Sequence, residues 1–230
     1  MPDRSCVNLL FESIQIRQRL PRGLAALDAV FKLCHVRSAP MFWRVMPFKA
    51  FCLLMQYMEE IMCDRVRLAV IAREEAEKPY NGKSKDCAPN IQDLVARFPK
   101  WSVDEADGLW CAAFVYHCVI LAGFKIPVRP KESSCSLAGC VAWEEWAQAD
   151  NRIEYHSGKD HVFKPAAGDI VLFDRVFNNM DHDHMGIVLE NYDDFIISAE
   201  GNVGNVSQIL ERKKNSHIRA YIRIPDHFSY

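Results

Sequence analysis

The chain has 230 residues, of which half are hydrophobic and a quarter are charged. This length and composition suit a globular protein of one or two domains with a substantial core. The formal net charge of −2 excludes the strongly basic surface typical of nucleic-acid-binding proteins, so we expect no nucleic-acid partner.

Residues 1–73 differ in composition from the remainder, being rich in Leu, Met, Phe and Arg with a single glycine. Hydrophobic periodicity predicts helices over Ser5–Leu20 and Leu24–Val36, and a long helix from Phe48 onward with a Met-rich stripe. That stripe either packs against neighbouring helices or binds a protein partner. We expect an α-helical N-terminal region of unassigned role.

Targeting signals and cysteine usage bear on the compartment. No signal peptide is evident, and no apolar run reaches the roughly 18 residues that a membrane-spanning helix needs. We therefore expect a protein that is cytoplasmic as synthesised, without stable membrane insertion. Nine cysteines with no C-x-x-C pair favour reduced thiols over a disulfide scaffold. For Cys135 and Cys140, a disulfide or a shared metal stays open as an alternative.

The second predicted domain, 74–230, begins with a loop-rich segment over Glu75–Asn90 and a short helix over Ile91–Phe98. A buried helix follows over Leu109–Gly123, because its apolar positions cover every side. Another helix is expected over Ala138–Ala149, and then an irregular polar segment over 151–164.

Beyond residue 164 the hydrophobic period changes to two, which is typical of strands. The predicted strands are Asp169–Asp174, Met185–Glu190, Phe195–Ala199 and Ile218–Ile224. Helices followed by a run of mostly antiparallel strands indicate the α+β class.

Cys111 lies in the first turn of the predicted helix over 109–123. Asp104, Glu105 and Asp107 lie just ahead of it, where a helix start favours negative charge. The helix dipole and free backbone N–H groups at this position favour a thiolate, which is the form a cysteine nucleophile needs. The alternative is a small core residue, the commoner role of a cysteine in an apolar helix.

A cysteine nucleophile needs a base, and His184 is the best placed of the eight histidines. It opens a predicted strand, and Gly186 lies on the same face, where it leaves room beside the imidazole. His182 shares that face and is the main competitor. The run 181–184 is alternatively a solvated polar loop or a metal site, although a third ligand of obvious spacing is missing.

Glu200 and Asn202 are candidates for the group that orients the base. Alternation along the next strand points both side chains to one face. Either side chain could accept the ring N–H of the histidine, fix its tautomer and stabilise the imidazolium. On spacing alone, the run 200–202 is equally well explained as a turn.

Several segments, in order, resemble the CHAP family, the cysteine- and histidine-dependent amidohydrolases/peptidases of bacterial cell walls and phage lysins. They cover roughly 74–225 and comprise Tyr80–Gly82, Trp110–Val115 with Gly123, Trp143 with Trp146, Pro165–Phe173, His184–Val188, Glu200–Asn202 and Ala220–Pro225. The resemblance implies a papain-like fold related to the NlpC-type cell-wall peptidases. The chain departs from the family at Asp183, where many members have glycine, and residues 1–73 resemble no cell-wall-binding module.

The resemblance also implies site roles. Cys111 would attack an amide carbonyl, and His184 would take and return the proton. Glu200 would orient His184, while Asn202 would hold that arrangement or donate to the oxyanion. Such a mechanism needs no metal or cofactor. The side chains expected to line the cleft are Trp110, Tyr80 and Asn81.

The implied substrate is a peptide amide in the stem or cross-bridge of peptidoglycan, cleaved by an amidase or endopeptidase. Such an enzyme would leave the cytoplasm by holin-type release or through a secretion system, with residues 1–73 as a delivery, targeting or partner-binding element. Two alternatives stay open: a protease or deamidase that acts on an intracellular protein, and a catalytically silent binding module.

Overall fold

The structure, a computed structural model, describes residues 63–84 and 87–230. Its helices are α5 (Asp64–Glu77), α6 (Gln92–Val95), α7 (Val103–Ala106), α8 (Cys111–Leu121) and α9 (Cys140–Ala149). Its strands are β1 (Glu154–Ser157), β2 (Ile170–Phe173), β3 (His184–Asn191), β4 (Phe195–Val203), β5 (Val206–Lys213) and β6 (Ile218–Arg223). The helices predicted over 5–20 and 24–36, and the Met-rich stripe, lie outside the described residues.

The strands form one antiparallel sheet in the order β1-β6-β2-β3-β4-β5. The predicted α+β class is confirmed, and β2, β3, β4 and β6 lie where strands were predicted. Two strands were missed. β1 falls in the segment expected to be irregular and is a short, half-exposed edge strand, while β5 is only partly buried and lacks a clean apolar alternation.

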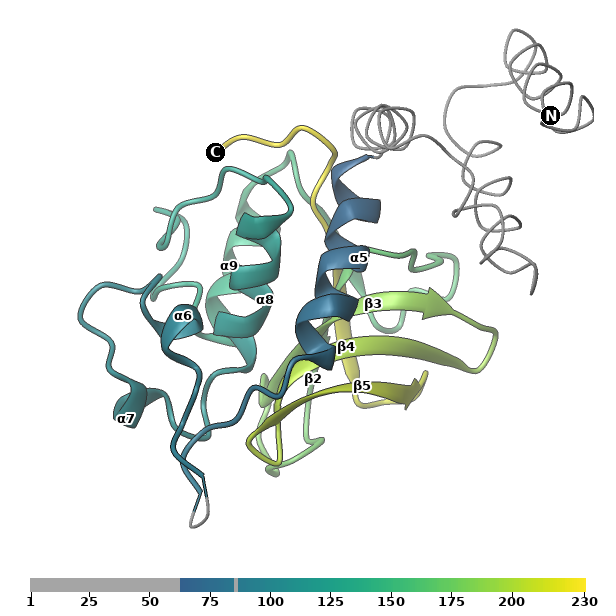
Figure 1. Cartoon of the computed structure of the whole chain (residues 1–230). Helices are drawn as coiled ribbons and strands as arrows, with labels where there is room; N and C mark the ends of the chain where they lie inside the picture. The colour runs from purple at the N-terminus through teal and green to yellow at the C-terminus, as the bar shows by residue number, and fades with distance from the viewer. Residues whose placement is uncertain (1–62, 85–86) are drawn as a thin grey trace, which may run out of the picture. The chain divides into compact units, whose positions relative to one another are not determined.

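Helix α8 is apolar on every side because it is packed on every side: all nine residues 111–119 are buried. It contacts α5 and the strands β3 and β4 (Figure 1). Cys111 is its first residue and therefore lies in the first turn, as predicted, although the helix begins two residues later than expected. The acidic residues ahead of it play a different part from the one expected, because Asp104 and Glu105 belong to the separate helix α7, where Ser102 and Glu105 form a capping box.

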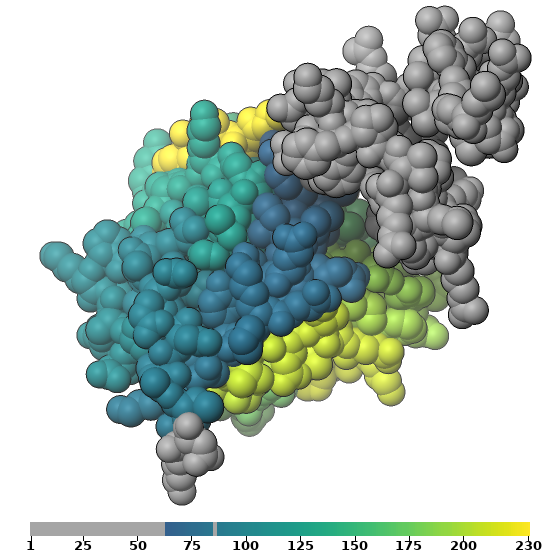
Figure 2. Space-filling model, viewed as in Figure 1, coloured from purple at the N-terminus to yellow at the C-terminus, as the bar shows by residue number. Residues whose placement is uncertain are grey.

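Helix α5 lies across β3, β4 and β5 and against α8 (Figure 1), and Figure 2 shows its dark-blue surface between the teal helical segments and the yellow-green strand β5. Leu68 and Ala72 are fully buried in this packing. The helix passes through Arg73, so the compact unit within the described residues begins at Cys63. The division of the whole chain into 1–73 and 74–230 stays a prediction.

None of the helices in the described part of the chain combines the length and the apolar character that a membrane crossing requires.

Candidate active site

The ends of two helices bring two thiols together. Cys111 is the first residue of α8 and Cys140 is the first residue of α9. Their Sγ atoms are 3.7 Å apart, and both residues are buried, with exposures of 6% and 8%. Backbone N–H groups without an intrahelical partner surround a thiol at such a position and favour its ionised form.

His184 is the first residue of β3 and is completely buried. Its Nε2 lies 2.7 Å from Glu200 Oε2 on the neighbouring strand β4. The rings of Phe173 and Phe177 pack against the imidazole, with centroid distances of 6.0 and 4.7 Å. The Nδ1 atom of His184 is buried and has no hydrogen-bond partner among the described residues, so it is the nitrogen left to exchange a proton with a thiol.

Glu200 is fully buried and satisfied on both oxygens. Besides His184, it accepts hydrogen bonds from Ser198 Oγ at 2.5 Å and from Arg212 Nε and Nη2 at 2.8 and 2.6 Å. Burial opposes its ionisation, but the bonds and charges of Arg212 and His184 outweigh burial and lower its pKa from 4.5 to about 2. Glu200 is therefore an anion throughout the physiological range.

The glycine at position 186 makes this pairing possible. A Cβ at Gly186 would lie 2.7 Å from Glu200 Cγ and 2.9 Å from the carbonyl oxygen of Ala199. The sequence predicted that Gly186 leaves room beside the imidazole, and the room is occupied by the carboxylate that orients it.

The electrostatics favour a thiolate–imidazolium pair. The pKa of Cys111 lies well below its ordinary value: the hydrogen bond from Cys140 lowers it most, burial opposes, and His184 and the Ala112 N–H lower it further. For His184, burial disfavours protonation, but the attraction of the Cys111 sulfur and the hydrogen bond to Glu200 raise its pKa from 6.5 to about 9. Between these two pKa values the sulfur is ionised and the ring is protonated.

Strand alternation predicted that Asn202 shares a face with Glu200, but the strand is irregular at this residue. The β4–β5 pairing has a register shift between Glu200 and Val203, and Asn202 adopts the left-handed conformation with φ +64°. Its Nδ2 donates to the carbonyl of Gly108 at 2.8 Å, and thus binds the turn ahead of α8 and not the imidazole.

Asn205 holds the same turn and was missed in the sequence. Its Oδ1 accepts from Trp110 Nε1 at 2.9 Å and from Gly108 N at 3.3 Å, and its Nδ2 donates to Asp107 Oδ1 at 2.8 Å and Lys83 O at 3.1 Å. In the sequence, the dipeptide Gly204-Asn205 indicates only the hairpin turn between β4 and β5, and it does not indicate a contact with the turn ahead of α8.

The three predicted cleft residues are placed differently. Trp110 is fully buried, so it does not present its ring to an open cleft. Tyr80 and Asn81 do line a pocket of about 310 Å³, together with residues 204–207. The residues lining that pocket do not include Cys111 or His184, so a substrate role for Tyr80 and Asn81 stays a prediction.

The side chains of the run 181–184 bind separate partners and do not converge as ligands. Residues 181–183 are a loop in which Asp181 is exposed, so the solvated-loop alternative holds for part of the run, whereas His184 is buried. Asp181 pairs with Arg175 at 2.8 Å, and His182 is hydrogen-bonded to Glu144 on α9. Asp183 accepts from three backbone N–H groups, those of residues 176–178. The structure therefore separates His182, engaged with Glu144, from His184, engaged with Glu200. Among the described residues no cluster of three or more His, Cys, Asp or Glu side chains could hold a metal ion.

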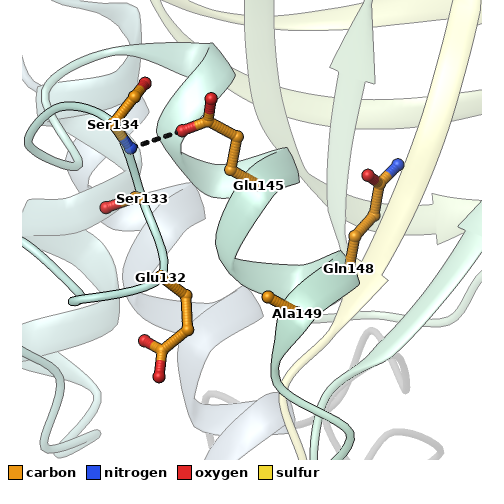
Figure 3. Close-up of a pocket in the computed structure, with 6 residues that line it drawn as sticks. All are labelled: Glu132, Ser133, Ser134, Glu145, Gln148 and Ala149. Atoms are coloured by element: carbon orange, nitrogen blue, oxygen red, sulfur yellow. Dashed lines mark hydrogen bonds between the residues drawn. The ribbon is translucent and has the colours of Figure 1, made fainter.

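A second pocket, of about 570 Å³, lies between the loop over 132–134 and α9 (Figure 3). Its lining residues include neither Cys111 nor His184. Across it, the backbone N–H of Ser134 donates to Glu145 Oε2 at 2.6 Å (Figure 3), so the loop that leads into α9 is tied to that helix.

Comparison with known families agrees with this geometry. The family model described as the CHAP domain matches residues 103–202. The matched span runs from α7 into β4 and contains Cys111, His184, Glu200 and Asn202. The match confirms the CHAP resemblance over residues 103–202, and the helices with one antiparallel sheet agree with its papain-like α+β fold. No curated protein matches the chain.

Proposed function

We propose that this chain, which carries a CHAP domain over residues 103–202, is a cysteine-dependent amide hydrolase. CHAP domains are amidase and peptidase domains, so the family supports hydrolysis in general. The observation that carries the assignment of residues is the buried series Cys111, His184 and Glu200, in which the imidazole is tied to the carboxylate at 2.7 Å and the thiol pKa is lowered.

In this proposal the Cys111 thiolate attacks the carbonyl carbon of an amide. The protonated Nδ1 of His184 gives its proton to the leaving nitrogen, and the C–N bond breaks to leave a thioester. Water, deprotonated by the same Nδ1, then hydrolyses the thioester and restores the thiol. Glu200 holds Nε2–H and stabilises the charged ring, while the free backbone N–H of Cys111 is a donor for the oxyanion.

The substrate we propose is a peptide amide in the stem or cross-bridge of peptidoglycan, because that is the substrate class that the family resemblance suggests. The test compares the full chain with its Cys111→Ala variant on peptidoglycan from several bacterial types, with released fragments read by mass spectrometry. Cys118→Ala is the matched control, because Cys118 lies buried on the same helix and burial raises the pKa of its thiol well above the ordinary value.

Fragments from the wild type and Cys118→Ala, but not from Cys111→Ala, would establish a Cys111-dependent cell-wall hydrolase, and their masses would identify the bond. If no wall releases fragments while Cys111 still reacts with iodoacetamide at neutral pH, the substrate is instead an intracellular protein. A Cys111 thiol that reacts only above the ordinary thiol pKa of about 8.5 would argue for a silent binding module.

A further inference from the structure

The hydrolytic mechanism uses one thiol, but the site contains two. Cys111 and Cys140 are in contact through their sulfur atoms at 3.7 Å, and both are free thiols. A disulfide has an S–S separation of about 2.05 Å, so the two sulfur atoms must move closer together before they can bond.

The backbone around Cys140 is held in place. Cys140 begins α9, and the indole N–H of Trp143, on the first turn, donates to Leu137 O at 2.8 Å. The loop ahead of it is tied to α9 through Ser134 and Glu145 (Figure 3). These two bonds hold the first turn of α9 in place. The contact between the two sulfur atoms is therefore set by how α8 and α9 are positioned.

We propose that Cys140 is the resolving thiol for oxidation of Cys111, so that a peroxide converts the pair into a reversible disulfide that blocks the nucleophile. The loss of hydrolysis that follows rests on the proposed function, whereas formation of the disulfide does not.

The chemistry proceeds in two balanced steps. The Cys111 thiolate attacks one peroxide oxygen, the O–O bond breaks, and the departing hydroxide takes a proton to become water; Cys111 is then a sulfenic acid. The sulfur of Cys140 attacks the sulfenic sulfur, the S–O bond breaks, and the leaving hydroxide takes the thiol proton of Cys140 as a second water. Two thiols are oxidised and one peroxide is reduced.

The electrostatics of the pair suit this order of events. Cys140 keeps its proton in the resting site, because the hydrogen bond to the Cys111 thiolate and burial raise its pKa well above the ordinary value. Oxidation turns Cys111 into a neutral sulfenic acid, which removes the largest cause of that rise. Cys140 thus ionises more readily once there is a sulfenic acid to attack.

The test treats the reduced full chain with hydrogen peroxide, alkylates the remaining thiols under denaturing conditions and maps tryptic peptides by mass spectrometry. The expected product joins the peptides Trp101–Lys125 and Glu132–Arg152 through Cys111 and Cys140. Because Cys118 lies in the first peptide and Cys135 in the second, Cys118→Ala and Cys135→Ser are the matched controls and must retain the link. Cys140→Ala and Cys140→Ser must lose it and accumulate sulfinic or sulfonic acid on Cys111.

Activity recovery gives a second readout. After peroxide and then dithiothreitol, the wild type should regain its own untreated rate of hydrolysis. Each Cys140 variant should regain only a small fraction of its own untreated rate, because sulfinic acid is not reduced by thiols. A Cys111–Cys135 link, an unmodified Cys111, or equal sulfinic acid in wild type and Cys140→Ala would overturn the proposal. Because the mass readout needs no substrate, an absence of hydrolysis on every wall would count against the proposed function alone.

Discussion

Arg212 stabilises the negative charge of the fully buried Glu200. Its guanidinium binds both carboxylate oxygens, and it also lies over the rings of Phe173 and Phe177 at 5.3 and 5.4 Å from their centroids. Those two rings enclose His184. Arg212 is thus a positioning residue that acts on the imidazole through its carboxylate partner and through its ring neighbours.

Replacing Arg212 by methionine should leave a buried carboxylate without its main partner. We expect Arg212→Met to destabilise the protein by roughly 3–5 kcal/mol, measured by urea unfolding, because an unpaired buried charge is costly. Arg212→Lys should restore only part of that loss, since a lysine cannot bind both oxygens in the same fork geometry. Arg175→Met is the control, because the exposed Arg175–Asp181 pair should contribute at most about 1 kcal/mol. Equal effects at both positions would contradict this account.

At the scale of elements, two glycines set how closely neighbouring segments approach. At Gly186, strand β3 admits the Glu200 side chain of β4. At Gly201, strand β4 meets α8 so closely that a Cβ would lie 2.5 Å from Phe114 Cβ and 2.8 Å from Trp110 Cζ3. The first contact serves the orientation of the imidazole, and the second brings the helix that carries the thiol onto the sheet.

Gly186→Ala tests the first of these contacts. The added methyl group would meet Glu200 Cγ and displace the carboxylate from His184. We expect overpacking to cost about 1–3 kcal/mol of stability, and kcat/KM to fall by a larger factor than the lost folded population explains. Gly139→Ala provides the comparison, because its nearest contact would be an ordinary 3.4 Å to Cys135 Sγ. Full activity in Gly186→Ala would show that the carboxylate position does not matter.

At the scale of the whole molecule, the packing of α5 against α8 and the sheet predicts which truncated chains still fold cooperatively. Truncation before Cys63 should leave a protein that unfolds cooperatively, because Leu68 and Ala72 still fill the core between α8 and the sheet. Truncation before Glu74, at the boundary read from the sequence, should remove that packing and abolish cooperative unfolding. Circular dichroism during heating distinguishes the two. Equal melting of both truncated proteins would place the boundary at residue 73 after all.

The pH dependence of stability should follow the three buried charges of the site. The pKa of Glu200 is lowered to about 2, so its contribution is present above pH 4.5 and is lost as the pH falls towards 2. The pKa of His184 is raised to about 9, so its contribution is present below pH 6.5 and is lost as the pH rises through 9. The pKa of Cys111 is lowered, so its contribution grows as the pH rises towards the ordinary thiol value and offsets the loss from His184. We therefore expect the free energy of unfolding to change little between pH 6.5 and 9 and to fall as the pH drops towards 2.

His184→Gln removes the imidazole and leaves the other two groups in place. The pKa of Cys111 should rise towards its ordinary value, because the neighbouring positive charge is lost, and the acid decline in stability should persist, since Arg212 still binds the Glu200 carboxylate. Iodoacetamide reactivity at a series of pH values measures the thiol, and urea unfolding measures the acid decline. Loss of the acid decline in this variant would assign it to His184 and not to Glu200.

By itself, the sequence determined the features that depend on neighbours along the chain. The position of Cys111 in the first turn of its helix, the strands β2, β3, β4 and β6, and the shared face of His184 and Gly186 all follow from hydrophobic period, caps and alternation. Such signals are local, because the periods of helix and strand and the conformations of turns are decided within a few residues.

Only the tertiary structure decided which distant groups meet. Cys140 touches Cys111, Arg212 binds Glu200, and Asn205 holds the turn before α8, although no spacing in the sequence indicated these contacts. Alternation also failed at Asn202, where the strand pairing shifts register and the side chain binds the carbonyl of Gly108. The physical reason is that these partners are selected by how helices and strands pack, and packing depends on the shape of the whole core and not on any short stretch of residues.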